Sequence, residues 1–194
     1  MACLFLEFSV KDIDKLLKDK SGIRLDIGGG ANPTPGFVNI DILPLKQVDI
    51  VHDLEETPWP LPDECVLTAT ASHVLEHINP HKGVFMNVMD EIWRVLKPRG
   101  QFAFVVPHAS SHGYQQDPTH CNMINETTMH YFDPDPEGNN IGQQLYGFYR
   151  PKPWKIERQY FSPEGNLEVL LTKRPMDKSY LPNWEPQSLT EEKL

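Results

Sequence analysis

The sequence predicts an α/β protein whose sheet is mostly parallel and ends in an antiparallel hairpin. Short apolar, β-prone runs recur between residues 23 and 106 and alternate with connections, which favours parallel strands joined by right-handed crossovers. Residues 81–96 repeat their apolar positions every three and four residues, which predicts the main helix. Two later runs are joined by Ser162-Pro163-Glu164-Gly165, which predicts the hairpin.

Length and charge bound the class of protein. The 194 residues have room for one domain, which we expect to span residues 1–174. The net charge of -9 weighs against a nucleic-acid-binding surface. Three cysteines are too few for a disulfide framework and fit a reducing compartment. With no apolar run near the roughly 20 residues that span a bilayer, and no signal-peptide pattern, we expect a cytoplasmic protein and no membrane association.

The chain is predicted to open with a short amphipathic helix over residues 9–20. Ser9 is a suitable N-cap, and Ser21-Gly22 ends the helix. Residues 23–27 follow as a buried strand, because three of the five are β-prone aliphatic side chains.

A glycine turn follows that first strand. Gly28, Gly29 and Gly30 let the backbone turn sharply and approach a ligand closely. Pro33 and Pro35 leave little room for a regular crossover helix, so a compact loop is expected before the second strand, residues 37–40. A shortened first helix is thus part of the predicted fold.

The middle of the chain supplies the rest of the parallel sheet. Short strands are expected at residues 48–51 and 66–71, with a Pro-rich acidic loop between them. The helix over residues 81–96 is expected to stop at the Lys-Pro-Arg-Gly sequence that follows it. Residues 101–106 are apolar nearly throughout, which predicts a central strand.

The last third of the chain is less regular. Residues 108–147 form an insert rich in His, Asp and Asn, with one helix expected near residues 125–131. Two strands at residues 154–161 and 166–172 make the hairpin. The polar, Pro-rich tail at residues 175–194 is expected to be poorly ordered.

Polar side chains collect where the predicted strands end. Since ligands of such sheets bind outside the carboxyl ends of the strands, these side chains are expected to share one site. An acid at the end of a second strand is well placed to accept both hydroxyls of a ribose, because a carboxylate offers two acceptor oxygens. The groups are Asp26 and the glycines after the first strand, Asp41 after the second, Asp53 after the third, residues 72–77 after the fourth and His108 after the fifth.

A set of five segments over roughly residues 23–108 resembles the class I S-adenosylmethionine-dependent methyltransferases of type 11. The segments are LDIGGG, VNID, VHDLE, ASHVLEHI and EIWRVLKPRGQFAFVVPH. The resemblance implies a Rossmann-like fold, S-adenosyl-L-methionine as cofactor and transfer of its methyl group to an acceptor. It also implies a function for each polar group. Asp26, Gly28, Gly29 and Gly30 would flank the methionine part, Asp41 the ribose, Asp53 and Leu54 the adenine, and Ser72 and His73 the methyl group.

Three of the four residues expected to act on the acceptor lie in the irregular insert, which takes the position of this family's substrate lid. An imidazole titrates near neutral pH and can serve as a general base. The residues to test first are His77, His108, Tyr114 and His120. The acceptor itself, whether a small molecule, a sugar, a protein or a nucleic acid, is not assigned, and neither is the oligomeric state.

Three alternatives compete with this interpretation. An NAD-dependent dehydrogenase needs a glycine or alanine where Pro33 stands, and a regular helix for the pyrophosphate. A zinc-dependent hydrolase would use His73, Glu76 and His77, which match H-x-x-E-H but run directly into Asn79-Pro80. No histidine spacing in the insert matches a zinc template, so no metal ligand is assigned, and whether the His-rich insert binds a metal stays open. A non-catalytic module that binds the adenosyl cofactor stays open.

Overall fold

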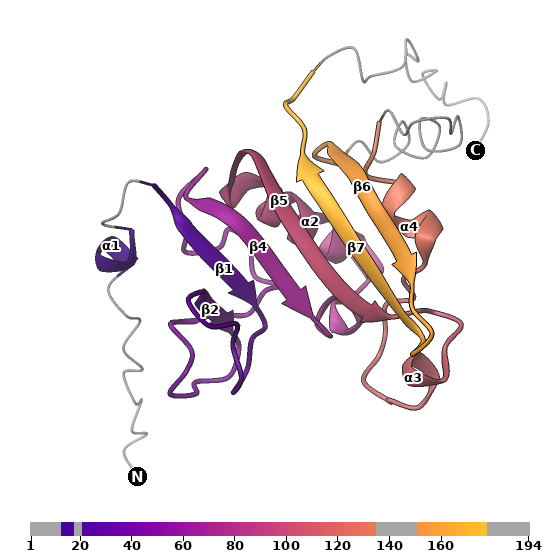
Figure 1. The fold of residues 1–194 in the computed structure, drawn as a ribbon. Helices are drawn as coiled ribbons and strands as arrows, with labels where there is room; N and C mark the ends of the chain where they lie inside the picture. Colours follow the sequence, from indigo (N-terminus) through magenta and orange to yellow (C-terminus); the bar gives the residue numbers. More distant parts are fainter. Residues whose placement is uncertain (1–12, 18–20, 135–150, 178–194) are drawn as a thin grey trace, which may run out of the picture.

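The structure is a computed structural model that describes residues 13–17, 21–134 and 151–177. Its seven strands form one sheet in the order β3-β2-β1-β4-β5-β7-β6 (Figure 1). The helical elements are α1 (Ile13–Leu16), η1 (Leu75–His77), η2 (His81–Gly83), α2 (Val84–Val95), α3 (His112–Gln115) and α4 (Glu126–His130). The strands are β1 (Ile23–Ile27), β2 (Val38–Asp41), β3 (Ile50–Val51), β4 (Val66–Ser72), β5 (Leu96–Pro107), β6 (Trp154–Phe161) and β7 (Asn166–Lys173).

The pairing confirms the predicted fold class. Strands β1 to β5 pair in parallel, whereas β7 runs antiparallel to both β5 and β6. The chain moves outward from β1 through β2 to β3, and then crosses to β4 on the other side of β1. A sheet of this kind binds ligands at such a reversal, outside the carboxyl ends of its strands. The topology therefore places the expected site beside the ends of β1 and β4.

The core lies between the sheet and helix α2, which packs behind β5 in the view of Figure 1. Alternate residues of β5 face this helix, and Phe102 and Phe104 are almost completely buried. The residue between them, Ala103, is exposed. Strand β5 has neighbours on both sides, as the apolar run predicted, but it buries one face more completely than the other.

Several boundaries differ from those expected. The Lys-Pro-Arg-Gly sequence ends α2 but belongs to β5, which begins at Leu96 directly after the helix. The main helix begins with the 3-10 turn η2, and α2 itself starts at Val84 because Gly83 takes a left-handed backbone with φ of 77°. Helix α3 in the insert was not predicted. Helix α4 matches the expected helix near residues 125–131, and Asn125 caps it.

Part of the remaining predictions falls outside the described residues. Of the opening helix over residues 9–20, only residues 13–17 are described, and Ile13–Leu16 is helical. Residues 135–147 of the insert and 178–194 of the tail lie outside the description. Within the described part of the chain, no helix is long and apolar enough to cross a membrane.

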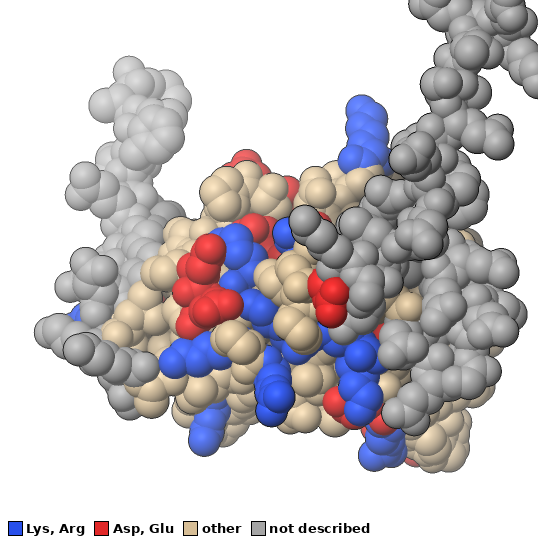
Figure 2. Space-filling view, turned by 90° about the horizontal axis from the view of Figure 1, so that it is seen from above, with Lys and Arg blue, Asp and Glu red and all other residues tan. Residues whose placement is uncertain are grey.

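Basic side chains gather at the end of the molecule that Figure 2 shows, together with acidic ones. In the described part of the chain, several ion pairs join segments that are distant in the sequence. Lys173 lies 3.6 Å from Glu64, and Arg174 lies 3.2 Å from the buried Asp133. Arg94 pairs with Asp63 and Glu91. Each of these three basic side chains thus has an acidic partner.

Candidate functional site

The turn after β1 brings the backbone of Gly28 against the segment that follows β4. Gly28 has a φ of 68°, in the left-handed region, and its N–H donates to the carbonyl of Ile40 at 2.8 Å. A Cβ on this residue would overlap the side chain of Val74. Only glycine fits such a position without displacing its neighbour. The turn is therefore held close to the carboxyl end of β4, where the site is expected.

A fully buried amide, that of Asn39 in β2, holds the loop between β1 and β2. Its Oδ1 accepts from the N–H of Gly29 at 3.1 Å, and its Nδ2 donates to the carbonyls of Gly30 and Gln47, both at 3.1 Å. A buried polar group of this kind is stable only when it is hydrogen-bonded. Sequence reasoning missed Asn39, although a polar residue inside the apolar run of residues 37–40 was a signal for it.

Asp41, at the end of β2, is buried and has contacts with the same loop. Its Oδ2 accepts from the N–H of Gly30 at 2.9 Å, and its Oδ1 accepts from the N–H of Leu43 at 2.8 Å. Each carboxylate oxygen has two lone pairs, so both can accept a further hydrogen bond. The carboxylate is thus held in place by the backbone and can still accept from a ligand.

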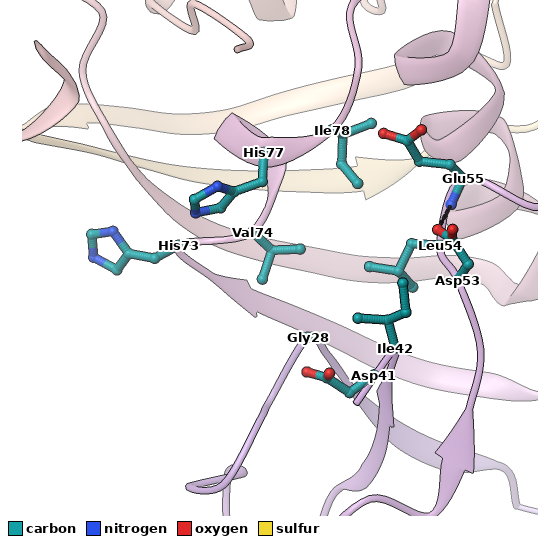
Figure 3. A pocket seen from close by; sticks show the side chains of 10 residues that line it. All are labelled: Gly28, Asp41, Ile42, Asp53, Leu54, Glu55, His73, Val74, His77 and Ile78. Atoms are coloured by element: carbon teal, nitrogen blue, oxygen red, sulfur yellow. Dashed lines mark hydrogen bonds between the residues drawn. The ribbon is translucent and has the colours of Figure 1, made fainter. Parts of the chain in front are cut away.

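Asp41 and Gly28 line a cavity of about 390 Å³ at the carboxyl ends of the parallel strands. Figure 3 shows His73 and His77 at one end of this cavity and Asp53 and Glu55 at the other. We call it the cofactor cavity, after the expectation from the sequence. Its lining residues are Gly28, Asp41, Ile42, Asp53, Leu54, Glu55, His73, Val74, His77 and Ile78. Three of these described residues are carboxylates, and none is Lys or Arg. Such a lining favours a cation and disfavours a phosphate.

His73 stands where the chain leaves β4 and enters the turn η1. Its φ of 56° is left-handed, a conformation that non-glycine residues adopt only where the surrounding structure holds them. Its Nδ1 lies 3.3 Å from Oε1 of Glu76. Burial, followed by the nearby imidazoles of His120 and His77, lowers the pKa of His73 below its ordinary value. The imidazole of His73 is therefore held in its neutral form near pH 7.

A second cavity, of about 520 Å³, adjoins the first. We call it the acceptor cavity. It shares His73 and His77 with the cofactor cavity, and its lining residues are His73, Glu76, His77, Pro107, Gly113, Gln116, Asp117, Pro118, His120 and Asn166. The insert thus contributes much of this lining. The rings of His77 and His120 meet edge to face, with centroids 4.8 Å apart.

Glu76 is the least expected member of the acceptor cavity. It is completely buried, and neither of its carboxylate oxygens has a hydrogen-bond partner among the described residues. Burial raises the pKa of Glu76 to about 7. A buried carboxylate without partners is costly, so its retention in the wall of a cavity points to a ligand.

The structure places the other predicted cofactor residues near the cofactor cavity but not in its lining. Asp26 is buried and accepts from the N–H of Thr34 at 2.6 Å. Gly29 and Gly30 bind the side chains of Asn39 and Asp41 through their N–H groups, and Ser72 ends β4 with an exposed side chain. These four residues shape the loop and the strand end that carry the lining residues.

Only two of the four residues expected to act on the acceptor line the acceptor cavity. His77 and His120 line the acceptor cavity, and Tyr114 is buried with its ring 5.3 Å from that of His120. His108 belongs to neither cavity lining, although it follows Pro107, which lines the acceptor cavity. Its Nε2 is 3.0 Å from Glu126, and its ring stacks on Phe161 with centroids 4.5 Å apart.

The H-x-x-E-H segment does not form the helix that an inverzincin peptidase requires. Residues Leu75–His77 make a single 3-10 turn, and His73 precedes that turn with a left-handed backbone. His73 and His77 therefore do not lie on one helical face. The zinc-hydrolase alternative loses its structural basis.

Residues 30–104 match a protein family described as a methyltransferase domain. This segment begins at the glycine turn and ends within β5, so it contains the strand ends that line the cofactor cavity. No curated protein sequence matches the chain.

The chain is similar in fold to solved methyltransferase structures. A SAM-dependent methyltransferase from Archaeoglobus fulgidus is 17% identical, with a TM-score of 0.52, and the match covers 85% of this chain and 95% of that one. The 16S rRNA (adenine(1408)-N(1))-methyltransferase of Catenulisporales acidiphilia is 14% identical, with a TM-score of 0.54 and coverage of 87% and 93%. The 1,6-didemethyltoxoflavin-N1-methyltransferase of Burkholderia thailandensis is 12% identical, with a TM-score of 0.53 and coverage of 87% and 80%.

Proposed function

We propose that the chain is an S-adenosylmethionine-dependent methyltransferase whose two cavities divide the work, a proposal supported by the methyltransferase domain matched over residues 30–104 and by the fold. The cofactor cavity holds S-adenosyl-L-methionine, and the acceptor cavity holds the molecule that receives the methyl group. The observation that carries this assignment is the lining of the cofactor cavity. Its acidic groups suit a cofactor that bears a sulfonium and an ammonium group and no phosphate.

The assignment along the cofactor cavity follows from its chemistry. Asp41 accepts hydrogen bonds from the two ribose hydroxyls, since its oxygens each retain a lone pair. Asp53 accepts from the exocyclic amine of the adenine, and Leu54 with Ile78 packs on the ring. The glycine turn flanks the methionine part, with Asp26, Gly29 and Gly30 supporting it from behind.

The wall shared by the two cavities is where we propose that transfer occurs. Bound S-adenosyl-L-methionine supplies an electrophilic methyl group. The protein has to align the acceptor with that group and keep water out. His73 and His77 belong to both linings, so they stand where donor and acceptor meet. Ser72, at the end of β4, precedes them and positions this segment.

Among the residues that could act on the acceptor, His77 and His120 have the strongest support, because both line the acceptor cavity. Each can accept a proton from a hydroxyl or an amine. We propose that Tyr114 positions His120, against which its ring packs. His108 has support only as a residue that fixes the insert, through Glu126 and Phe161.

The rest of the organisation is also part of the proposal. We propose one domain over residues 1–174 and an acceptor site lined by the described part of the insert, within residues 108–134. The sparse cysteines support a cytoplasmic location; Cys65 and Cys121 are free thiols in the described part of the chain. A non-catalytic binding module would bind the cofactor and transfer no methyl group. Its test is transfer of a radiolabelled methyl group from S-adenosyl-L-methionine to fractions of a cell extract.

The experiment that tests the cofactor site measures binding of S-adenosylhomocysteine by calorimetry. Asp41→Asn keeps the size of the side chain but removes its charge, and Asp41→Ala removes it altogether. Loss of charged hydrogen bonds of about 1.5–3 kcal/mol corresponds to affinity losses of about tenfold or more. Glu56→Ala is the matched control, since Glu56 is exposed and is not a lining residue of the cofactor cavity. Unchanged affinity in folded Asp41→Ala would refute the ribose assignment.

A further inference from the structure

Three side chains that commonly bind metal ions lie together in the acceptor cavity. They are Glu76 and His77, from the turn after β4, and His120, from the insert more than forty residues later in the chain. One potential ligand atom from each lies within 4.8 Å of those of the other two. These three residues are called the Glu-His-His cluster below.

The hydrogen bonds of His77 leave one of its nitrogens free to bind a metal. The hydroxyl of Thr119 donates to Oδ1 of Asp117 at 2.7 Å, so its lone pair accepts from Nδ1 of His77 at 3.1 Å. A neutral imidazole that is protonated at Nδ1 has its lone pair on Nε2. The Asp117–Thr119 pair thus selects the tautomer of His77 in which Nε2 is a ligand atom.

His120 has the same arrangement with a different partner. Its Nδ1 lies 2.9 Å from the backbone carbonyl of Tyr114, which can only accept, so Nδ1 carries the proton. Its Nε2 is left with a lone pair and lies 3.8 Å from Oδ2 of Asp117. Metal-binding histidines typically donate their other N–H to a carbonyl, a carboxylate or a water molecule. Both histidines of the cluster therefore hold the tautomer that metal binding requires.

Glu76 supplies the second, independent observation. Its side chain is fully buried in the wall of this cavity. Its two oxygens lack hydrogen-bond partners among the described residues, and Nδ1 of His73 lies 3.3 Å from Oε1 without making a hydrogen bond. A cation bound by these oxygens would supply the missing partner. With Asp117 at the rim, the acceptor cavity has two carboxylates to balance a divalent cation.

We propose that Glu76, His77 and His120 bind one divalent transition-metal cation in the acceptor cavity. Two imidazoles and one carboxylate form a ligand set that suits Zn²⁺ and leaves a coordination position open. The ligands differ from those of the H-x-x-E-H hypothesis, because His73 is replaced by His120. No fixed spacing along the chain could have revealed them.

The position of the cluster also indicates which acceptors the enzyme takes, a step that rests on the proposed function. An open coordination position in the acceptor cavity would bind an oxygen atom and polarise it, so with the cation bound His77 and His120 act as its ligands and not as the general bases described above. We therefore infer that the acceptor offers an oxygen, such as a hydroxyl group, beside the wall that both cavities share. An acceptor that binds through its apolar surface alone would gain nothing from the cation.

The test uses the full chain without a histidine tag, stripped of metal with a chelator and titrated with Zn²⁺ in a calorimeter. We expect one Zn²⁺ per chain, and binding at least about tenfold weaker in Glu76→Gln and His120→Gln. His112→Gln is the matched control, because His112 is an exposed histidine of the same insert and is not in the cluster. It should bind Zn²⁺ as the wild type does. Absence of stoichiometric Zn²⁺ in the wild type, or equal binding in all variants, would overturn the proposal.

A further variant covers the case in which a ligand variant does not fold. Thr119→Ala keeps all three ligands and removes the hydroxyl that accepts from Nδ1 of His77, leaving the backbone carbonyl of Thr119, 3.4 Å from that nitrogen, as a more distant acceptor. It should weaken Zn²⁺ binding about tenfold, and unchanged binding would contradict the tautomer argument. Binding of S-adenosylhomocysteine is measured in parallel. A protein that binds Zn²⁺ but not S-adenosylhomocysteine would refute the proposed cofactor site alone. A protein that binds S-adenosylhomocysteine but not Zn²⁺ would refute the metal site alone.

Discussion

Replacing Gly28 by alanine should destabilise the protein for two separable reasons. The first is the left-handed backbone at φ of 68°, which costs a residue with a Cβ about 1–2 kcal/mol. The second is steric, because the new Cβ would overlap Cγ2 of Val74 and lie 3.1 Å from its Cγ1. Overpacking of this kind costs about 1–3 kcal/mol. We therefore expect Gly28→Ala to lose about 3 kcal/mol of unfolding free energy.

The chain offers a matched control for the backbone term. Gly30 is also left-handed, with φ of 52°, but a Cβ there would meet no atom within 4 Å. Gly30→Ala should therefore show the backbone cost alone, about 1 kcal/mol after the smaller entropy of its unfolded state is allowed for. The difference between the two variants measures the clash with Val74.

A double-mutant cycle with Val74→Ala tests the same reasoning. Val74 is partly buried, so its truncation alone should cost about 1 kcal/mol. If the clash is real, Gly28→Ala/Val74→Ala should lose about 2 kcal/mol, rather than the 4 kcal/mol that additivity predicts. Urea unfolding followed by circular dichroism gives all four free energies. An additive cycle, or a Gly28→Ala variant as stable as Gly30→Ala, would refute the argument.

Two further predictions concern buried polar groups. Asn39→Asp should lose about 2–3 kcal/mol of unfolding free energy, because its Oδ2 would face the carbonyls of Gly30 and Gln47 that now accept from Nδ2; a loss below 1 kcal/mol in urea unfolding would contradict this. For Glu91, burial raises its pKa, but the hydrogen bonds from Arg94 and Trp59 outweigh burial and lower it below the ordinary 4.5. A lowered folded-state pKa means that the stabilisation is present above pH 4.5 and is lost as the pH falls through the lower folded-state value. Glu91→Gln should therefore cost about 3 kcal/mol at pH 7 and show a smaller loss of stability on acidification; thermal unfolding from pH 3 to 7 that leaves the two proteins parallel would argue against it.

The sequence was sufficient for features that depend on neighbouring residues. The helical repeat gave the helix before β5, the paired apolar runs gave the hairpin, and the strand ends identified Asp41 and Asp53 as residues of one cavity. The glycine turn could be located because Pro33 and Pro35 exclude a helix after it.

The rest depends on contacts between distant segments. Asn39 accepts a hydrogen bond from Gly29, ten residues away across the turn. This hydrogen bond contributes to stability because folding buries Asn39. The Glu-His-His cluster joins the end of β4 to the insert after β5. His108 looked equivalent to His120 because both follow strand β5, yet only His120 turns into the acceptor cavity. A local pattern cannot separate two histidines of one irregular segment.

The loop between β1 and β2 takes the place that a crossover helix has in a dinucleotide-binding fold. In a dinucleotide-binding fold the helix end supplies N–H groups to a pyrophosphate. Here the N–H groups of Gly29 and Gly30 bind Asn39 and Asp41 of the neighbouring strand instead. Those donors are consumed within the protein, so the loop has little left to offer a phosphate. The same contacts fix the carboxylate of Asp41 at the mouth of the cavity, which suits a cofactor with a ribose and a positive charge.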